Sequence, residues 1–241
     1  MDRAAFAFST IEALDRAKTV TAALGELARA TRAFGLEHFI IAGIPAPDKK
    51  LAPYVLMHNW PAGWFERYNS LNYLHSDPVI RKLRSSTKPT AWSEAPYDVS
   101  KDVIGHAVMM EAREFRLNNG LSVPIYTLSG DQAAASFGGS RFELTAEDRA
   151  ALHLIAIYGH ARAQELSRPP AWKSRSRPML SAREIEVMKW VAAGMTSDAI
   201  AERLGIAHST VETHILHACQ KLDAMNRTQA VAEAIRARLI P

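Results

Sequence analysis

The chain contains 241 residues, 29 of them Lys or Arg and 25 Asp or Glu, so its formal net charge is +4. Apolar residues make up 48% and charged residues 22%, which excludes a disordered chain and supports one or two folded domains. The single cysteine, Cys219, excludes an intramolecular disulfide and a zinc centre built from thiolates. Because the sequence shows no signal-peptide pattern and no run of about eighteen apolar residues, we expect a cytoplasmic protein without a membrane partner.

The surplus of positive charge lies in the last third of the chain. Residues 1–165 hold 18 basic and 18 acidic side chains, whereas residues 166–241 hold 11 and 7, which accounts for the whole net charge. Prolines and basic residues without an apolar period mark residues 167–178 as an extended linker. We therefore predict a neutral N-terminal domain over residues 1–166 and a basic C-terminal domain over residues 179–241.

The N-terminal domain alternates helical and strand patterns. Apolar residues at helical spacing predict helices over residues 10–34, 98–118 and 145–166. Strands are predicted over residues 38–44 and 54–60, with a turn at 45–53, and a second pair over 121–128 and 132–138, split by the turn at 129–131. This order predicts an α+β fold, an α-β-α sandwich with an antiparallel sheet and an interior that can hold a ligand.

Residues 60–92 concentrate aromatic side chains around one acidic residue. Three of the five tryptophans lie here, and the four-residue spacing of Trp64 and Tyr68 places both rings on one helix face. An ordinary aromatic core explains the rings but not Asp77, since a carboxylate among rings needs a donor from the protein or from a ligand N–H group. The segment is therefore a candidate ligand site.

Residues that start and end helices predict an all-α fold of four short helices in the C-terminal domain. Ser181 and Glu184 have the spacing of a capping box, and Gly194 stands where a left-handed residue ends the first helix. A second helix follows Thr196 and ends at Gly205. The third and fourth helices are predicted over residues 209–222 and 228–239.

The second and third of these helices are separated by a tight glycine turn, which is typical of a helix-turn-helix. The second helix of such a pair can enter the major groove of DNA, and the basic charge of the domain favours phosphate contacts. A helical bundle that binds another protein is the alternative reading of this pattern.

The residues of this domain resemble the DNA-binding domain of LuxR-type regulators. The likeness covers residues 194–206, 209–214 and 226–231 in the order and spacing of the family. The resemblance implies that the helix over residues 209–222 is the recognition helix. It further implies base-edge contacts by Glu212, Thr213, Leu216 and His217, and phosphate contacts by Thr210, His214, Lys221 and Arg227.

Two features of this recognition helix leave alternatives. Ala207 stands where the family often has a Ser cap, so we expect Ser209 or His208 to cap the helix. Glu212 either accepts from a base edge or serves only as the capping-box partner of Ser209.

The N-terminal domain independently resembles the same family. Six characteristic positions of the autoinducer-binding domain of LuxR-type quorum-sensing receptors are matched by Trp64, Tyr68, Asp77, Pro78, Trp92 and Gly120. The resemblance implies a receptor for an N-acyl-homoserine lactone, with no cofactor besides this ligand. It assigns Trp64 to the lactone carbonyl and Asp77 to the amide N–H. It also places Tyr68 along the acyl chain and Ser136 at the amide carbonyl.

Trp60 departs from the family pattern, because many members have Tyr at this position. An indole can still donate through Nε1–H, but it fills more of the site than a phenol ring. A bulkier wall favours a short, branched or aromatic acyl group over a long chain.

The sequence therefore predicts a ligand-responsive transcription factor that binds DNA as a homodimer. Two recognition helices related by a two-fold axis call for a two-fold symmetric operator. An enzyme is disfavoured because hydrolase and phosphate-loop motifs are missing, and a response regulator because the acidic clusters of a receiver domain are missing. An orphan regulator that senses another molecule, or none, is the remaining alternative. His214 and His217 are three residues apart but have no evident third ligand, so no metal site is predicted.

Overall fold

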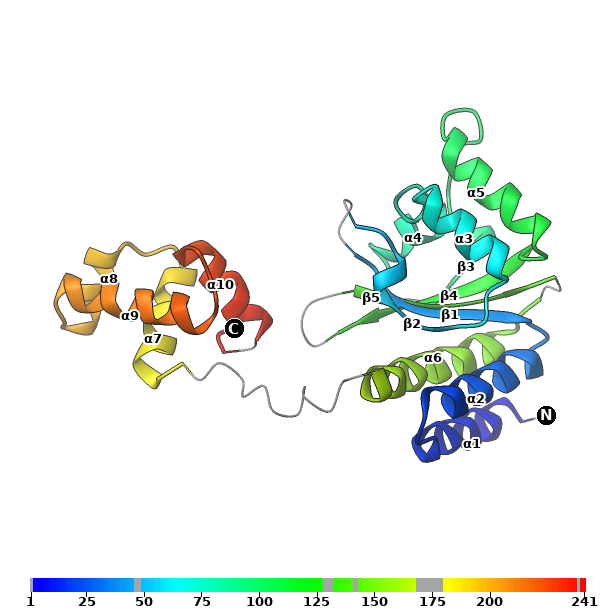
Figure 1. Cartoon of the computed structure of the whole chain (residues 1–241), viewed down its shortest axis with the longest axis horizontal. Helices are drawn as coiled ribbons and strands as arrows, with labels where there is room; N and C mark the ends of the chain where they lie inside the picture. The colour runs from blue at the N-terminus through cyan, green and yellow to red at the C-terminus, as the bar shows by residue number, and fades with distance from the viewer. Residues whose placement is uncertain (1, 46–48, 128–131, 141–142, 168–179, 238) are drawn as a thin grey trace. The chain divides into compact units, whose positions relative to one another are not determined.

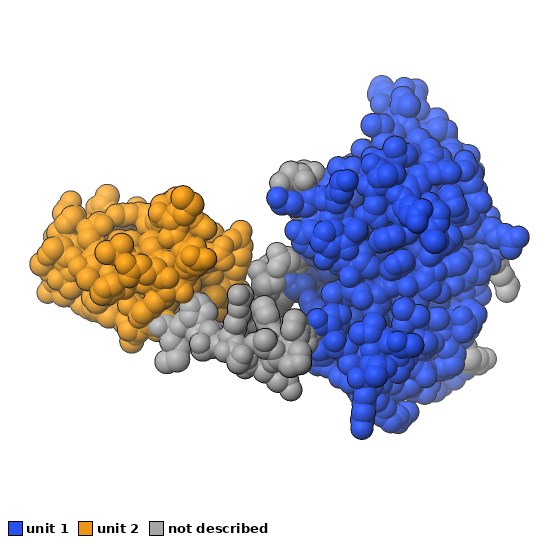
Figure 2. Space-filling view, in the orientation of Figure 1, with its two compact units in different colours: residues 1–127, 131–168 blue, residues 128–130, 169–241 orange. Residues whose placement is uncertain are grey.

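The computed structural model describes residues 2–45, 49–127, 132–140, 143–167, 180–237 and 239–241. The chain divides into two compact units, drawn in blue and orange in Figure 2. One comprises Met1–Thr127 and Asp131–Arg168, and the other Leu128–Gly130 and Pro169–Pro241. The predicted linker at 167–178 lies outside the described residues except for Ser167, which ends a helix. The predicted turns at 45–53 and 129–131 also include residues outside the described ones.

An antiparallel sheet forms the middle layer of the first unit (Figure 1). Its strands are β1 (His38–Gly43), β2 (Val55–His58), β3 (Thr90–Ala91), β4 (Asn119–Tyr126) and β5 (Gln132–Gly139), in the spatial order β2-β1-β5-β4-β3. One face is covered by α1 (Arg3–Arg16), α2 (Val20–Ala33) and α6 (Ala146–Ser167). The other is covered by α3 (Ala62–Ser70), α4 (Pro78–Leu83) and α5 (Val103–Glu114). The predicted α+β sandwich is confirmed.

The single helix predicted over residues 10–34 is wrong, because two helices occupy this region. Helix α1 ends at Arg16 and Ala17 is extended. The side chain of Thr19 then accepts a hydrogen bond from the Ala22 N–H and caps α2. A hydroxyl cap satisfies an otherwise unpaired amide and so stabilises a helix start that the apolar period alone does not reveal.

Three other elements are shorter than predicted, one of them the last helix, which was predicted over residues 228–239 but ends at Arg236. The strand predicted at 54–60 ends at His58, because the Asn59 side chain turns inward and accepts from the Phe39 N–H at 2.6 Å. The helix predicted from residue 98 begins only after Asp102, whose carboxylate accepts from the Gly105 N–H at 2.9 Å.

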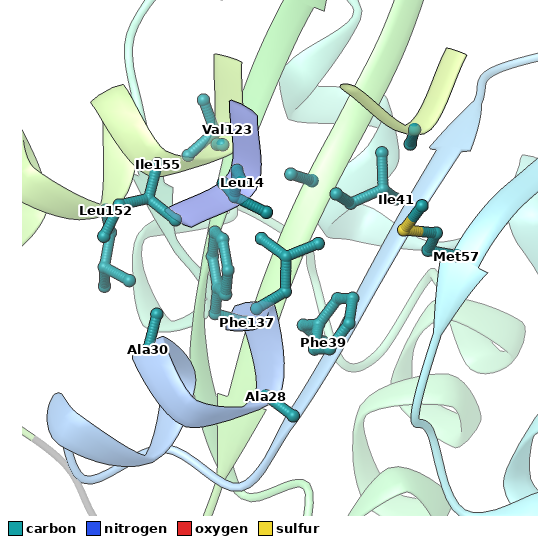
Figure 3. Packing of buried hydrophobic residues seen from close by; sticks show 14 of the residues in the cluster. Leu14, Ala28, Ala30, Phe39, Ile41, Met57, Val123, Phe137, Leu152 and Ile155 are labelled. Carbon is teal, nitrogen blue, oxygen red and sulfur yellow. The ribbon is translucent and has the colours of Figure 1, made fainter. Parts of the chain in front are cut away.

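Side chains of the central strands alternate between two cores, one on each face of the sheet. Large residues such as Phe39, Leu121 and Phe137 pack against α1, α2 and α6 (Figure 3). The opposite face carries small residues, namely Ala42, Gly120, Ser122, Ala134, Ser136 and Gly138. Because these side chains are short, space remains between the sheet and the layer of α3, α4 and α5.

The described part of the second unit contains helices α7 (Ala182–Ala192), α8 (Ser197–Leu204), α9 (His208–Lys221) and α10 (Arg227–Arg236). The predicted capping box is confirmed, since Ser181 Oγ accepts from the Glu184 N–H and the Glu184 carboxylate accepts from the Ser181 N–H. Gly194 and Gly205 follow α7 and α8 with left-handed φ angles of +82° and +64°, which favour glycine. The predicted helix-turn-helix arrangement is therefore confirmed.

Helix α9 begins without a side-chain cap. Its N-cap residue is Ala207, and neither His208 nor Ser209 caps it, so the predicted cap and the capping box between Ser209 and Glu212 are both wrong. Val211, fully buried against α7 and α8, instead holds the first turn by packing. Tertiary contacts have replaced local capping here.

Candidate ligand cavity and DNA interface

A cavity of about 60 Å³ lies between the small-residue face of the sheet and the helices α3, α4 and α5, with room for several water molecules. Most of its wall is apolar, contributed by residues such as Ile40, Leu74 and Val108. All six residues proposed from the sequence for ligand binding line this one cavity: Trp60, Trp64, Tyr68, Asp77, Trp92 and Ser136. The fold thus gathers side chains separated by up to 76 positions in the chain.

Asp77 performs a structural task and retains acceptor capacity. Its Oδ1 accepts from the N–H groups of Val79 and Ile80 at 2.8 and 3.4 Å, which caps α4. Its Oδ2 accepts from the Tyr68 hydroxyl at 2.8 Å. A carboxylate has about four acceptor sites, so at least one is left for a donor in the cavity. Burial raises the pKa of Asp77, partly opposed by its hydrogen bonds, and burial beside Asp77 raises the pKa of Tyr68 well above its usual range.

Three rings form one end of the cavity. The ring centroids of Trp60 and Tyr68 are 5.5 Å apart, and those of Trp64 and Tyr68 are 5.6 Å apart, both in edge-to-face geometry. Trp60 Nε1 is buried and has no hydrogen-bond partner among the described residues. Trp64 Nε1 likewise has no hydrogen-bond partner among the described residues. A buried N–H without an acceptor costs about 1–3 kcal/mol, so Trp60 favours a ligand that offers a carbonyl oxygen, and the unpaired N–H of Trp64 can donate to a second one.

Trp92 is fixed by the small residues beneath it. A Cβ at Gly120 would lie 2.4 Å from Trp92 Cε2, and one at Gly138 would lie 2.4 Å from Trp92 Cη2, so neither position has room for a side chain. The ring so placed donates from Nε1 to Ser122 Oγ at 2.9 Å. Ser122 Oγ lies 2.6 Å from Ser136 Oγ. This chain of polar groups joins three residues of the cavity wall.

Ser122 lines the cavity but was missed by the sequence analysis. Its signal lay in the two-residue alternation of β4, where Leu121 and Val123 face one core while Ser122 faces the other. The register places Ser122 directly opposite Ser136. A serine alternating with large apolar residues in a buried strand indicates a polar position on the cavity face.

The recognition helix exposes a mixed surface in the second unit. Thr210, Thr213, Leu216 and His217 are exposed, as the sequence predicted for groups that contact DNA, and His214 is half-buried. Gln220 is also exposed, on the same face as Thr213 and His217, and was missed by the sequence analysis. Its position three residues after His217 is the signal that would have found it.

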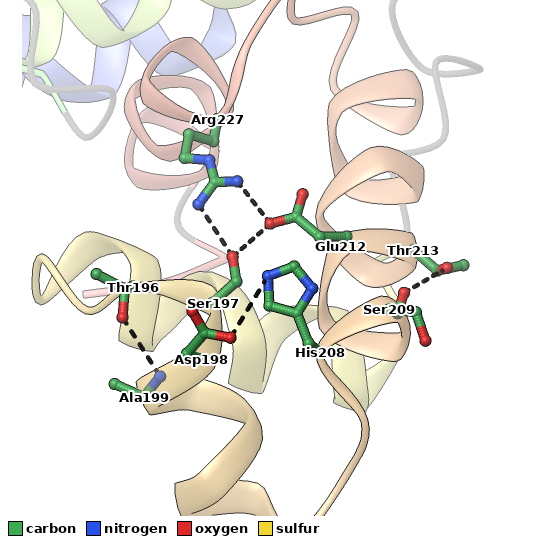
Figure 4. A network of polar contacts seen from close by, with 9 residues as sticks. All are labelled: Thr196, Ser197, Asp198, Ala199, His208, Ser209, Glu212, Thr213 and Arg227. Atoms are coloured by element: carbon green, nitrogen blue, oxygen red, sulfur yellow. Dashed lines mark hydrogen bonds and ion pairs between the residues drawn. The ribbon is translucent and has the colours of Figure 1, made fainter.

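The other three residues proposed for DNA contacts are engaged within the unit. Glu212 Oε1 accepts from Arg227 Nη2 at 2.8 Å and from the hydroxyl of Ser197 (Figure 4). These two donors lower the pKa of Glu212. Lys221 Nζ donates to both carboxylate oxygens of the buried Glu184, at 2.9 and 2.7 Å. The charged ends of Glu212, Lys221 and Arg227 thus tie α9 to α7, α8 and α10.

Comparisons with known proteins identify the families of both domains. Residues 19–163 match the family described as "Autoinducer binding domain", and residues 178–234 match "Bacterial regulatory proteins, luxR family". The transcriptional activator protein BjaR1 of Bradyrhizobium diazoefficiens is 42% identical over 234 residues, covering 97% of this chain and 96% of BjaR1. The quorum sensing-dependent regulator RpaR of Rhodopseudomonas palustris is 40% identical over 86% of this chain and 83% of RpaR.

Solved structures share the fold at lower identity. The crystal structure of Escherichia coli SdiA aligns with a TM-score of 0.72 and 21% identity over 98% of each chain. The N-acylhomoserine lactone dependent factor CepR2 of Burkholderia cenocepacia aligns with a TM-score of 0.55 and 23% identity, over 68% of this chain and 97% of CepR2.

The cavity and the helix-turn-helix define a transcription regulator that couples an autoinducer-binding domain to a DNA-binding domain. The chain belongs to the LuxR family of bacterial quorum-sensing regulators, whose members are regulators rather than enzymes. Within the described residues, no helix is both long and apolar enough to cross a membrane.

Proposed function

We propose that the ligand is an N-acyl-homoserine lactone and that Trp60, Trp64, Asp77 and Ser136 bind its polar groups. The observation that supports this proposal is that the free hydrogen-bond donors and acceptor of the cavity wall complement the acceptors and donor of this ligand. The two indole N–H groups lack acceptors among the described residues, and Asp77 retains acceptor capacity beside them. An acyl-homoserine lactone offers two carbonyls and a single amide N–H, which is the complement of this set.

We assign the roles from the family resemblance together with the hydrogen bonds that the side chains already make. Trp64 donates to the lactone carbonyl, and Asp77 accepts from the amide N–H. Trp60 and Ser136 donate to the amide carbonyl, whose oxygen has two lone pairs. The Tyr68 hydroxyl is already held by Asp77, so its ring supplies apolar contact while its O–H orients the carboxylate. Trp92 acts as a wall of the cavity, with its own N–H already paired.

We further propose that the acyl group is short, branched or aromatic. Trp60 packs against Trp64 and Tyr68 in the cavity wall, which side chains such as Ile44 and Met109 also line. A long chain would have to displace these side chains, whereas a compact or flat group fills the space in contact with them.

We also propose a homodimer on a two-fold symmetric operator. Helix α6 exposes Leu154, Ile157 and Tyr158 at helical spacing, with exposed fractions of 38%, 41% and 45%. Such a stripe of apolar side chains on one helix suits an isologous interface, in which the same face of two copies pairs. In the second unit, Ile235 of α10 is 47% exposed and offers a smaller apolar contact of the same kind.

On DNA, we propose that Thr213, Leu216 and His217 meet base edges while Thr210 and His214 approach phosphates. Glu212, Lys221 and Arg227 support the helix from inside the domain through the contacts that already hold them. Leu216 is 56% exposed, which suits contact with a thymine methyl group.

The test is thermal unfolding of the full chain with a panel of acyl-homoserine lactones that vary in chain length, branching and aromatic character. A bound ligand raises the midpoint of unfolding by mass action. We expect the largest shift with short branched or aromatic acyl groups. A flat response across the panel would contradict the lactone proposal and favour a regulator that senses another molecule or none. Trp60→Tyr should shift the preference toward longer chains, and an unchanged preference would refute the argument from ring size.

A further inference from the structure

We propose that Ser122 is a positioning residue that turns the Ser136 hydroxyl hydrogen toward the ligand. The inference rests on the proposed function, because it takes Ser136 as a donor to the acyl carbonyl. It adds Ser122 to that site. It also states the direction of two hydrogen bonds, from Trp92 to Ser122 and from Ser122 to Ser136, which together form a path.

The first step of the path has only one possible direction. An indole Nε1–H can donate but cannot accept, so Trp92 donates and Ser122 Oγ accepts, at 2.9 Å. The direction follows from the chemistry of the indole, whose ring lies close over Gly120 and Gly138 on the cavity face of the sheet. Ser122 therefore begins with one lone pair already occupied.

The second step follows from where each hydroxyl can place its hydrogen. Ser122 has an exposed fraction of 0%, and Ser136 one of 6%. The 2.6 Å separation of their oxygens allows either serine to donate. If Ser136 donated, the Ser122 hydrogen would have no acceptor among the described residues, and a buried unpaired hydroxyl is costly. If Ser122 donates, every polar atom of Ser122 and Trp92 is paired, so this arrangement is favoured.

In this arrangement the hydroxyl hydrogen of Ser136 has no acceptor among the described residues. Ser136 is also the more exposed of the two serines. Ser136 lies on β5, where Ile40 and Ser122 flank it across the sheet on the cavity face. A hydroxyl that accepts a hydrogen bond becomes a stronger donor, because hydrogen bonds in a chain polarise one another. The hydrogen bond from Ser122 thus turns the Ser136 O–H toward the ligand carbonyl and makes it a stronger donor.

The test is a double-mutant cycle in the full chain, with ligand affinity measured by calorimetry for the lactone that gives the largest thermal shift. Ser136→Ala should weaken binding by about threefold to tenfold, the usual net value of one neutral hydrogen bond. Ser122→Ala should weaken binding by a smaller factor, because Ser136 keeps its hydroxyl but loses its direction. In the Ser136→Ala background, Ser122→Ala should have no further effect on affinity.

Additive losses in the cycle would overturn the inference, since they would mean that Ser122 contacts the ligand itself or acts on the fold alone. Absence of binding by the unmodified chain would instead overturn the lactone proposal, so the two failures are distinguishable. If Ser122→Ala does not fold, Ser122→Cys keeps a similar volume with a weak acceptor and should give the same non-additive pattern.

A second readout is independent of the ligand. The indole N–H resonance of Trp92, assigned with Trp92→Phe, should move upfield in Ser122→Ala because its acceptor is lost. It should move far less in Ser136→Ala, since that change leaves the first hydrogen bond intact. Equal shifts in both variants would contradict the proposed path.

Discussion

Replacing Trp60 by Phe separates the role of its N–H group from that of its ring. In the ligand-free protein the buried Nε1–H has no partner among the described residues, so its removal relieves a cost of about 1–3 kcal/mol. The smaller ring leaves unfilled volume beside Trp64 and Tyr68, and the lost packing costs a comparable amount, on the order of 1–3 kcal/mol. The two effects oppose each other and leave a net change of at most about 2 kcal/mol, so we expect the midpoint of unfolding to change by at most about 8 °C.

Ligand binding should respond differently to Trp60→Phe. The acyl carbonyl loses a donor inside a mostly apolar cavity, and an acceptor left short of its partner costs about 1–3 kcal/mol. This corresponds to an affinity about fivefold to 150-fold weaker. The thermal shift produced by a fixed concentration of lactone, measured from the midpoint of the same variant without ligand, should shrink accordingly.

The measurement is calorimetric affinity together with thermal unfolding, each with and without the lactone. The matched control is Trp190→Phe, because Trp190 lies in the DNA-binding domain, where its ring centroid is 4.0 Å from the Arg203 guanidinium carbon. That change should leave lactone affinity within about twofold, well below the loss of one hydrogen bond. An affinity for Trp60→Phe equal to that of the control would refute the assignment of the Trp60 N–H to the ligand.

The remaining predictions concern the carboxylate, the dimer and the recognition helix. Asp77→Asn keeps an acceptor for the cap of α4 but presents an NH2 group to the cavity, so circular dichroism should show an intact fold while calorimetry shows at least about tenfold weaker lactone binding. Because burial raises the pKa of Asp77 in the free protein and a ligand N–H favours its ionised form, affinity should rise with pH up to this raised pKa and level off above it, and Asp77→Asn should lose this dependence. Tyr158→Glu should shift sedimentation of the lactone-bound protein from dimer to monomer, with Tyr54→Glu as the exposed control; an unchanged dimer would exclude α6. Leu216→Ala should change preference at one base pair in binding-site selection at unaltered stability, whereas Glu212→Gln should lower stability by about 0.2–1 kcal/mol and leave base preference unchanged.

Local sequence signals predicted most of the fold, and the exceptions have physical causes. The start of α7 at Ser181 and the ends marked by Gly194 and Gly205 depend on chemistry within one turn, so the sequence contains them. The break before α2 depends on the Thr19 cap. Because the apolar spacing continues through this stretch, the sequence predicted one helix instead of two. The start of α9 at His208 depends on packing with other helices, which no local pattern encodes.

The site shows the same division between local and long-range information. The family resemblance identified the aromatic residues and Asp77, but it could not predict which groups within the protein form hydrogen bonds with one another. Glu212 is the clearest case, since its spacing from Ser209 suggested a capping box while its carboxylate pairs with Arg227, fifteen positions away. Ser122 was missed because its significance arises only when β4 and β5 pair and bring it opposite Ser136.

The pairing of β4 and β5 also explains how a small domain keeps a polar site inside an apolar core. One face of these strands supplies the packing that stabilises the domain, with Leu121 and Phe137 fully buried against the helices. The other face is made of small residues, which contribute little packing but leave space for the Trp92 ring and for two hydroxyls. Because the alternation of a strand separates the two faces, a change such as Ser122→Ala alters the site without removing a large side chain from the stabilising core. This separation is why we expect substitutions on the cavity face to alter ligand binding while the packing on the opposite face keeps the sheet folded.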